Sequence, residues 1–307
     1  MFRWFKKPWR PAAPMADGHV RPANGIDYNI PVLCYHSWNI AGREYEKNDH
    51  IALESDLHEL ARRGYAIASL DFIADILMGK PGPWNGARKL AGISFDDGRD
   101  FDYHDFTHPA FGRIESFHTT LVKSEEWLPP LGHGARATAF VIASPEAREI
   151  LDVKCGDGRG EWQDDWWKDC AGKGMIDIAN HGWDHVHVEL PRVRQKDNIK
   201  GSFHEISSFA DAEGQISEAQ NYINQMTNGQ NVHLFGYPYG HASAYLKDAY
   251  FPEHSKRIGL RAAFGTGGES VRPDCSLWNI PRFVFGWHWN TPASFTALLD
   301  AVERGEL

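Results

Sequence analysis

The fold is decided by residues 92–98, which read GISFDDG: a short apolar run followed by Asp96, Asp97 and a glycine. Continuous rather than alternating hydrophobicity is typical of a strand buried on both faces, as in a parallel sheet. The two carboxylates then stand at the carboxyl end of that strand, where barrel enzymes place catalytic groups. Neighbouring side chains on an extended backbone point in different directions, so one carboxylate can bind a metal while the other faces a substrate. Taken alone, Asp-Asp-Gly is also typical of a simple turn.

Similar apolar runs occur on both sides of this stretch and predict further buried strands. They are residues 31–35, 66–70, 137–143, 175–179, 232–235, 261–264 and 280–285. Helical patterns lie between several of them, at residues 50–64 and, interrupted by Gly214, at residues 203–226. Ser144 and Thr291 each precede a proline, as helix N-caps do. Alternating strands and helices predict an α/β fold, and about eight strands favour a distorted barrel.

Composition excludes several other classes of protein. The chain has 307 residues, of which 42% are hydrophobic and 24% charged, the balance of an ordinary globular protein rather than a disordered or fibrous one. It contains no apolar run of the roughly 18 residues needed for a transmembrane helix. A net charge of −9 argues against general nucleic-acid binding. The scattered cysteines, Cys34, Cys155, Cys170 and Cys275, are expected to be free thiols rather than a disulfide framework.

Two segments stand apart from the strand–helix pattern. Residues 1–26 are expected to form an N-terminal tail whose first residues are basic and aromatic, with weak contact to an anionic membrane surface as the alternative. No apolar signal-peptide stretch follows this charged start, so the chain is expected to be cytoplasmic, or periplasmic or secreted if Met1 is not the native start. Residues 27–307 then form one barrel. Within it, residues 99–134 are long for one connection and are predicted to roof the active-site cleft.

A second signal, NHGWDH at residues 180–185, directly follows an apolar run. His181 and His185 are four residues apart, a spacing that places two imidazoles on one side of a helical turn. With Asp97 they make a two-histidine, one-carboxylate set that leaves positions open for water and substrate. His104 and His108 repeat the spacing but lie in the long connection, so they are interpreted as surface or rim residues. Nearby His187 is expected to support the ligands rather than bind metal.

The third signal is FGYPYG at residues 235–240, again at the end of an apolar run. Its alternative reading is a Pro-Tyr-Gly turn without a further role. Together FDDG, HGWDH and YPYG, in this order and each after a strand, resemble the polysaccharide deacetylases of carbohydrate esterase family 4, the NodB-homology fold. The resemblance extends from about residue 30 to residue 285.

The resemblance implies a distorted (β/α)7-type barrel and one divalent metal ion, in that family usually zinc. By matching motifs, Asp97, His181 and His185 would be the metal ligands and Asp96 the general base. The Tyr239 backbone amide, in the turn that Pro238 begins, would help to hold the tetrahedral oxyanion.

Two positions depart from the family pattern. The third motif normally reads Arg-x-Pro-Tyr, but Gly236 stands in the arginine position, and the late Leu-x-His that supplies the general acid is absent. Both gaps are filled in a circularly permuted subgroup that resembles bacterial biofilm poly-N-acetylglucosamine deacetylases. There the acid comes from the first strand, where this chain has His36 in VLCYH. Arg282 is the candidate to replace the missing arginine, with an ordinary surface ion pair as the alternative, and His288 is the competing acid.

The activity implied is removal of N-acetyl groups from an amino-sugar glycan or glycan intermediate by metal-activated water. Trp183, Trp287 and Trp289 are candidate platforms for a sugar ring, although tryptophan is also a common core residue.

Three rivals to this activity stay open at the sequence level. The first is a cyclic-imide or ureide hydrolase, like the allantoinase-type relatives of the same fold, whose metal set is often incomplete. The second is an inactive glycan-binding relative. The third is a two-histidine, one-carboxylate iron oxygenase, which strand–helix alternation disfavours because those enzymes use all-β barrels.

Overall fold

The computed structural model describes residues 28–80, 89–131, 136–171, 174–194 and 199–307. The tail predicted for residues 1–26 lies outside this part of the chain. Among the described residues, no helix is long and apolar enough to cross a membrane. All four cysteines are free, as predicted from their spacing.

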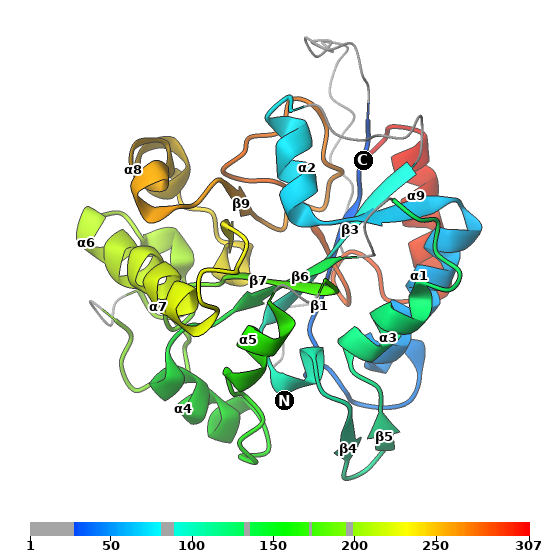
Figure 1. Ribbon diagram of the computed structural model, residues 1–307, viewed down its shortest axis with the longest axis horizontal. Helices are drawn as coiled ribbons and strands as arrows, with labels where there is room; N and C mark the ends of the chain where they lie inside the picture. Colours follow the sequence, from blue (N-terminus) through cyan, green and yellow to red (C-terminus); the bar gives the residue numbers. More distant parts are fainter. Residues whose placement is uncertain (1–27, 81–88, 132–135, 172–173, 195–198) are drawn as a thin grey trace.

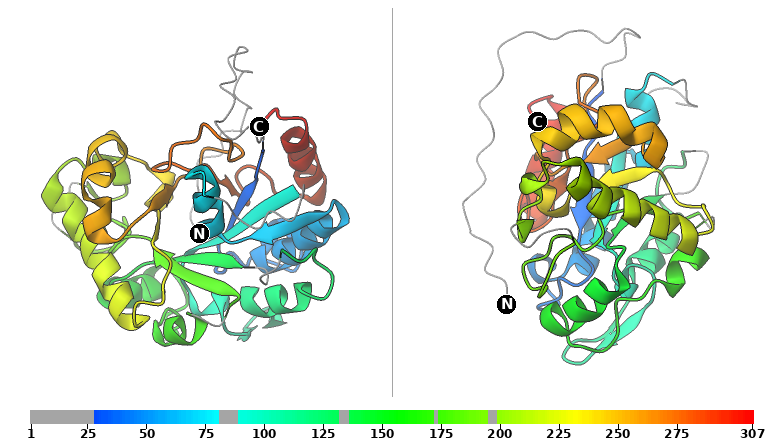
Figure 2. Two further views of the ribbon diagram at one scale, coloured as in Figure 1. Left: turned by 45° about the horizontal axis from the view of Figure 1, so that its top comes forward. Right: turned by 90° about the vertical axis from the view of Figure 1, so that its left-hand side faces the viewer.

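A parallel sheet of 8 strands lies at the centre, with helices packed around it (Figures 1 and 2). Neighbouring strands follow the order β10-β1-β3-β6-β7-β8-β9, and β2 pairs with the first part of β3. The strands are β1 (Val32–Tyr35), β2 (Tyr65–Ala68), β3 (Lys89–Asp97), β6 (Ala137–Val141), β7 (Ile176–Asn180), β8 (Leu234–Gly236), β9 (Ala262–Phe264) and β10 (Phe283–Val284). Each apolar run of the sequence overlaps one of them, so the predicted strands are confirmed.

The sheet curls round until its two ends meet. β10 pairs with β1, and Ile280, three residues before β10, pairs in parallel with Phe264 of β9. Further backbone bonds, Gly265 N to Ile280 O at 2.8 Å and Gly268 N to Arg282 O at 3.1 Å, continue this contact. The result is the distorted (β/α)7-type barrel that the strand count and the resemblance predicted.

The helices begin where the sequence places their caps. α1 (Asp49–Arg62) follows Asn48, whose side chain accepts a hydrogen bond from His50 N. The Ser144 side chain caps α4 (Pro145–Cys155), and Thr291 forms a capping box with Ser294 at the start of α9 (Pro292–Glu303). Each capping oxygen accepts from a backbone N–H that lacks an intrahelical partner. The remaining longer helices are α2 (Leu70–Leu77), α5 (Asp165–Cys170) and α8 (Phe251–Ile258).

The helix predicted over residues 203–226 is wrong at its start. Residues Phe203–Glu205 form a separate 3₁₀ turn, and the helix begins only after Ser208, whose side chain accepts from Asp211 N. α6 (Phe209–Ala212) then passes through a π-helical turn, Glu213–Ser217, into α7 (Glu218–Met226). The π turn contains Gly214, the residue at which the sequence pattern was interrupted.

The long connection after β3 divides into two unlike parts. Its β4 (Phe106–His108) and β5 (Gly112–Ile114) form an antiparallel hairpin at the edge of the molecule (Figure 1). α3 (Phe117–Ser124), by contrast, belongs to the main core: the Phe117 ring is fully buried and stacks on Phe95 of β3 at 4.3 Å. Interpreting the whole of residues 99–134 as a peripheral roof is therefore wrong for α3, and residues 132–134 lie outside the described part.

Candidate active site

Strand register brings the predicted site residues to one rim of the barrel. Asp97 at the end of β3 pairs with Val141 of β6, and Val141 pairs with Asn180 of β7. His181 follows Asn180 directly, and its backbone N–H donates to Val141 O at 3.0 Å. Because parallel strands all end at the same edge, motifs far apart in the chain meet here.

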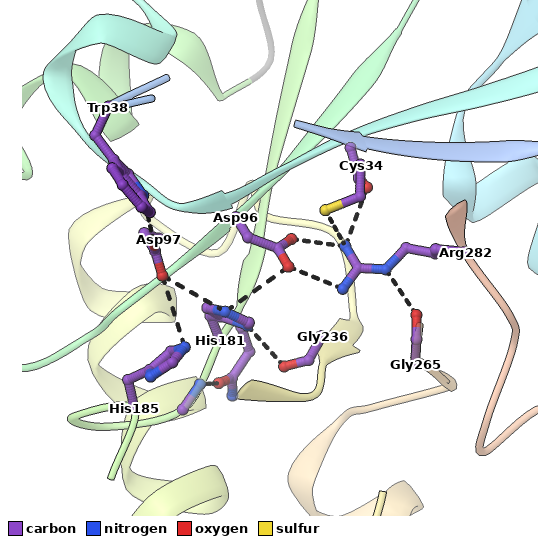
Figure 3. A network of polar contacts seen from close by, with 12 residues as sticks. Cys34, Trp38, Asp96, Asp97, His181, His185, Gly236, Gly265 and Arg282 are labelled. Carbon is purple, nitrogen blue, oxygen red and sulfur yellow. Dashed lines mark hydrogen bonds and ion pairs between the residues drawn. The ribbon is translucent and has the colours of Figure 1, made fainter. Parts of the chain in front are cut away.

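The predicted metal ligands face one another (Figure 3). Asp97 Oδ1 lies 3.8 Å from His181 Nε2 and 3.7 Å from His185 Nε2. One ligand atom from each of the three residues lies within 4.8 Å of the others. In a tetrahedral site with metal–ligand bonds of about 2.1 Å, ligand atoms are about 3.4 Å apart. The two distances to Asp97 exceed this value by only a few tenths of an ångström, so the three side chains could hold one divalent cation after small shifts.

The surroundings of both histidines favour the neutral imidazole form. His181 Nδ1 lies 2.8 Å from the Gly236 carbonyl oxygen, which orients Nε2 towards Asp97. Burial lowers the pKa of His181, although Asp96 and Asp97 oppose this effect. Burial also lowers the pKa of His185, and neighbouring His181 lowers it further. A metal ion binds the neutral imidazole, so both shifts favour metal binding.

Unusual backbone conformations gather at this rim. Only five non-glycine residues in the described part of the chain have positive φ, and three of them are Asp97 at 80°, His185 at 61° and Tyr239 at 58°. Such conformations carry strain of about 1–3 kcal/mol and persist where the surrounding structure enforces them. Their concentration at the predicted ligands and the predicted oxyanion residue marks this rim as a functional site.

Asp96 points into the barrel and pairs with Arg282. The guanidinium donates from Nη1 to Oδ1 at 2.6 Å and from Nη2 to Oδ2 at 2.9 Å, a bidentate pair of the strong kind. Burial would raise the pKa of Asp96, but the Arg282 charge and the hydrogen bonds from Arg282 lower it below its usual range. Asp96 is thus ionised at neutral pH although it is buried.

The structure explains why Gly236 replaces the family's motif arginine. A Cβ atom at Gly236 would lie 2.7 Å from the Phe140 ring, so no side chain fits there without movement of Phe140. The Arg282 guanidinium lies over the same ring, 5.0 Å from its centroid, and reaches Asp96 from the segment before β10. Arg282 is fully buried, which excludes the alternative of a surface ion pair.

His36 follows β1 and lies near Asp96, on the other side of that residue from the predicted metal ligands. One of its ring nitrogens lies within 4.8 Å of a carboxylate oxygen of Asp96 and of Cys34 Sγ. The turn that carries His36 is anchored by buried Asp49, which accepts from His36 N at 2.7 Å and from Asn39 Nδ2 at 2.5 Å. The competing acid, His288, instead accepts the Val284 N–H at Nδ1, at 2.7 Å. Geometry therefore favours His36 as the residue facing Asp96.

Comparison with known proteins shows which family part of the chain is similar to. Residues 128–262 match the family model described as polysaccharide deacetylase. Over these residues the chain is similar to the polysaccharide deacetylases. The matched segment contains His181, His185, Pro238 and Tyr239, and enzymes of this family are hydrolases that cleave the amide bond of N-acetyl groups. No curated protein sequence matches the chain significantly.

Solved deacetylase structures share the fold over most of the chain. The Streptococcus pyogenes deacetylase PplD, in complex with acetate, is 16% identical with a TM-score of 0.60, covering 90% of this chain and 99% of its own. A de-N-acetylase from Aggregatibacter actinomycetemcomitans is 15% identical with a TM-score of 0.57, covering 88% and 99%. The BpsB deacetylase domain from Bordetella bronchiseptica is 16% identical with a TM-score of 0.53, covering 83% and 95%.

The Pro238–Gly240 turn lies beside the predicted metal ligand His185. Pro238 is buried and begins a 3₁₀ turn in which Tyr239 is left-handed. The Tyr239 ring meets the His185 ring edge-on, with centroids 4.3 Å apart. The His187 ring also lies close, with its centroid 5.7 Å from that of the His185 ring.

The three predicted sugar platforms differ in exposure. Trp289 is only 2% exposed and its Nε1 donates to Asp56, so its prediction as a platform is wrong. The Trp183 ring is covered by the Arg194 guanidinium at 4.4 Å, and Tyr222 meets it edge-on. Trp287 is 53% exposed and follows β10, the neighbour of β1. It is the most open of the three.

Sequence reasoning missed two residues that contact Asp97. Trp38 Nε1 donates to Asp97 Oδ2 at 2.8 Å, and Trp162 Nε1 donates to the Asp97 carbonyl oxygen at 2.9 Å. Neither tryptophan lies in one of the three sequence motifs. Nothing in the sequence therefore distinguishes Trp38 and Trp162 from the rest of the 12 tryptophans. The repeated spacing of His104 and His108 has no such role: His108 accepts the Ala110 N–H within the β4–β5 hairpin.

Proposed function

We propose that the protein is a metal-dependent N-deacetylase that removes acetyl groups from an amino-sugar glycan or glycan intermediate. The observation that carries the proposal is the convergence of Asp97, His181 and His185 within 4.8 Å, beside an ionised Asp96 held by Arg282. Three nitrogen and oxygen ligands with space for a fourth are typical of a catalytic zinc site. A divalent cation there acts as a Lewis acid that polarises the acyl oxygen and lowers the pKa of water.

The chain's own residues then handle the protons. Asp96 accepts the proton of the attacking water, and Arg282 fixes the orientation of its carboxylate. His36, in the turn directly after β1, donates a proton to the departing amine nitrogen. The Tyr239 backbone amide stabilises the negative charge that develops on the acyl oxygen. A general acid on the first strand is the arrangement of the permuted subgroup, to which we assign the chain.

Metal content and acetate release test this proposal together. Protein purified without chelator should contain about one equivalent of divalent metal, and acetate release from N-acetylated sugars and oligomers should stop on chelation and return with zinc. His181→Ala should lose both metal and activity. His104→Ala, from the second pair with the same spacing, is the matched control and should keep both.

The rival functions predict other results. Release of product from cyclic imides or ureides, with no acetate from any acetylated sugar, would favour the allantoinase-type hydrolase. Binding of N-acetylated oligomers without turnover in the metal-loaded protein would favour an inactive glycan-binding relative.

A further inference from the structure

Two tryptophan indoles donate hydrogen bonds to Asp97, one to its side chain and one to its backbone. Trp38 comes from the turn after β1 and donates Nε1–H to the carboxylate, at 2.8 Å from Oδ2. Trp162 comes from the segment between α4 and α5 and donates to the carbonyl oxygen at 2.9 Å. Ile142 N also donates to that carbonyl oxygen, at 3.3 Å. These contacts enforce the left-handed backbone of Asp97.

The contact from Trp38 divides the two carboxylate oxygens between different partners (Figure 3). Oδ2 accepts the indole N–H, whereas Oδ1 faces His181 Nε2 and His185 Nε2 at 3.8 and 3.7 Å. A carboxylate with one oxygen engaged in this way presents the other to a cation and is disposed to bind through a single atom. Hydrogen bonds of this kind to a metal ligand commonly change metal affinity by 10–100-fold.

The backbone of the turn that carries Trp38 is closed by hydrogen bonds, and its ring, 36% exposed, packs against His36. Ile40 N donates to Trp38 O at 2.9 Å, and the turn closes again where Asn39 N donates to His36 O at 3.0 Å. The Trp38 ring meets the His36 ring edge-on, with centroids 5.8 Å apart. The indole therefore lies between the candidate acid and the metal ligand and contacts both.

We propose that Trp38 is a positioning residue for the metal ligand Asp97, acting through its indole N–H. This inference rests on the proposed function, because it assigns a role towards the same metal. Trp162 supports the backbone of the ligand, and Trp38 sets which carboxylate oxygen is offered to the cation.

The test measures zinc affinity of the full chain by competition with a chromogenic chelator. Trp38→Phe keeps an aromatic ring but removes the donor, and should raise the zinc dissociation constant about 10–100-fold. Trp38→Gln carries an amide N–H at the same number of bonds from Cβ as the indole N–H, and should restore part of the affinity. Trp287→Phe, on the neighbouring strand end, is the matched control and should bind zinc like the wild type. Circular dichroism establishes that each variant is folded.

Cobalt substitution supplies a second readout. If Asp97 is freed to bind through both oxygens in Trp38→Phe, the coordination number rises and the visible absorption of the cobalt protein weakens. Trp38→Gln should retain the wild-type spectrum.

The possible failures are distinguishable. If wild-type protein binds zinc and Trp38→Phe binds it equally well, the inference is wrong while the proposed function stands. An increase in KM alone, at unchanged zinc affinity, would make Trp38 a sugar platform and would also overturn the inference. Equal weakening in Trp38→Phe and Trp38→Gln would show that ring packing, not the N–H, matters. Absence of zinc binding by the wild type would overturn both proposals.

Discussion

Replacing Arg282 by methionine removes the positive charge from the buried centre of the site while keeping an unbranched apolar side chain. The guanidinium has no solvent exposure and donates to both Asp96 oxygens, to Ser94 Oγ at 3.0 Å and, through Nε, to Gly265 O at 3.0 Å. No water replaces these contacts easily in a fully buried position. The variant therefore leaves the Asp96 carboxylate without its counter-ion.

Breaking a buried ion pair from one side costs about 3–5 kcal/mol. At about 1.36 kcal/mol per pKa unit, this corresponds to roughly 2–4 units. In the wild type the folded-state pKa of Asp96 is depressed, so the pair stabilises the fold above the unfolded pKa near 3.9 and loses this effect as pH falls. In Arg282→Met the counter-ion is gone, and burial raises the pKa of Asp96. The pH dependence of the free energy of unfolding therefore reverses: the variant is least stable at neutral pH and regains stability as Asp96 becomes protonated at lower pH.

Urea unfolding at about pH 5 and about pH 8 measures this reversal. The deficit of Arg282→Met relative to wild type should be larger at the higher pH, and adding Asp96→Asn should recover part of it because no buried charge remains. Deacetylation should fall by roughly 10²–10⁴-fold, with its acid limb moved to higher pH, because Asp96 is then protonated near neutrality. Arg63→Met, which removes pairs with Glu59 and Asp300, is the control and should leave the pH profile of activity unchanged. Unaltered stability and pH profile in Arg282→Met would refute the electrostatic role assigned to this residue.

Three further predictions concern other parts of the molecule. His36→Ala should lower turnover by roughly 10²–10⁴-fold at unchanged metal content, whereas His288→Ala should not; loss of turnover only in the second variant would show that the acid is on the last strand. Asp56 is buried and accepts from Tyr35, Tyr45 and Trp289, and burial raises its pKa to about 7. Asp56 therefore keeps its proton to higher pH in the folded state than in the unfolded state, and the free energy of unfolding should fall as pH rises from about 4 to about 7. Asp56→Asn should reduce this pH dependence, measured by urea unfolding at several pH values. Phe117→Ala should lower the free energy of unfolding by about 3–5 kcal/mol, and Arg113→Ala on the exposed hairpin by less than about 0.5 kcal/mol; equal effects would contradict the assignment of α3 to the core.

The sheet was predictable because strands that are buried on both faces need apolar residues at successive positions. Each strand shows as a continuous apolar run, and the motifs at residues 96–97, 181–185 and 238–239 follow such runs directly. Parallel pairing then requires these motifs to meet at one rim. The start of the helix after Ser208 was not predictable in this way, because Phe203 and Ile206 are apolar residues at helical spacing but belong to a separate 3₁₀ turn and the residue that ends it.

Contacts between distant segments were the part that sequence could not supply. Arg282 and Asp96 are 186 residues apart, and only the meeting of β10 with β1 brings them together. Trp287 and Trp289 look alike in the sequence, yet one is exposed and the other donates to Asp56, 233 residues away. Trp38 and Trp162 belong to no motif, because an indole that holds a ligand needs only the right place in three dimensions.

The separation of Asp96 from Arg282 has a consequence for how the protein is made. At roughly 5–20 residues per second, a ribosome adds Arg282 about 9–37 s after Asp96, since 186 residues lie between them. During that interval β1 also lacks its neighbour β10. A nascent chain that buried Asp96 early would hold an unpaired charge, so we expect the carboxylate to stay hydrated or protonated until the last strand emerges. Closure of the barrel and assembly of the catalytic centre are then one late event in biosynthesis.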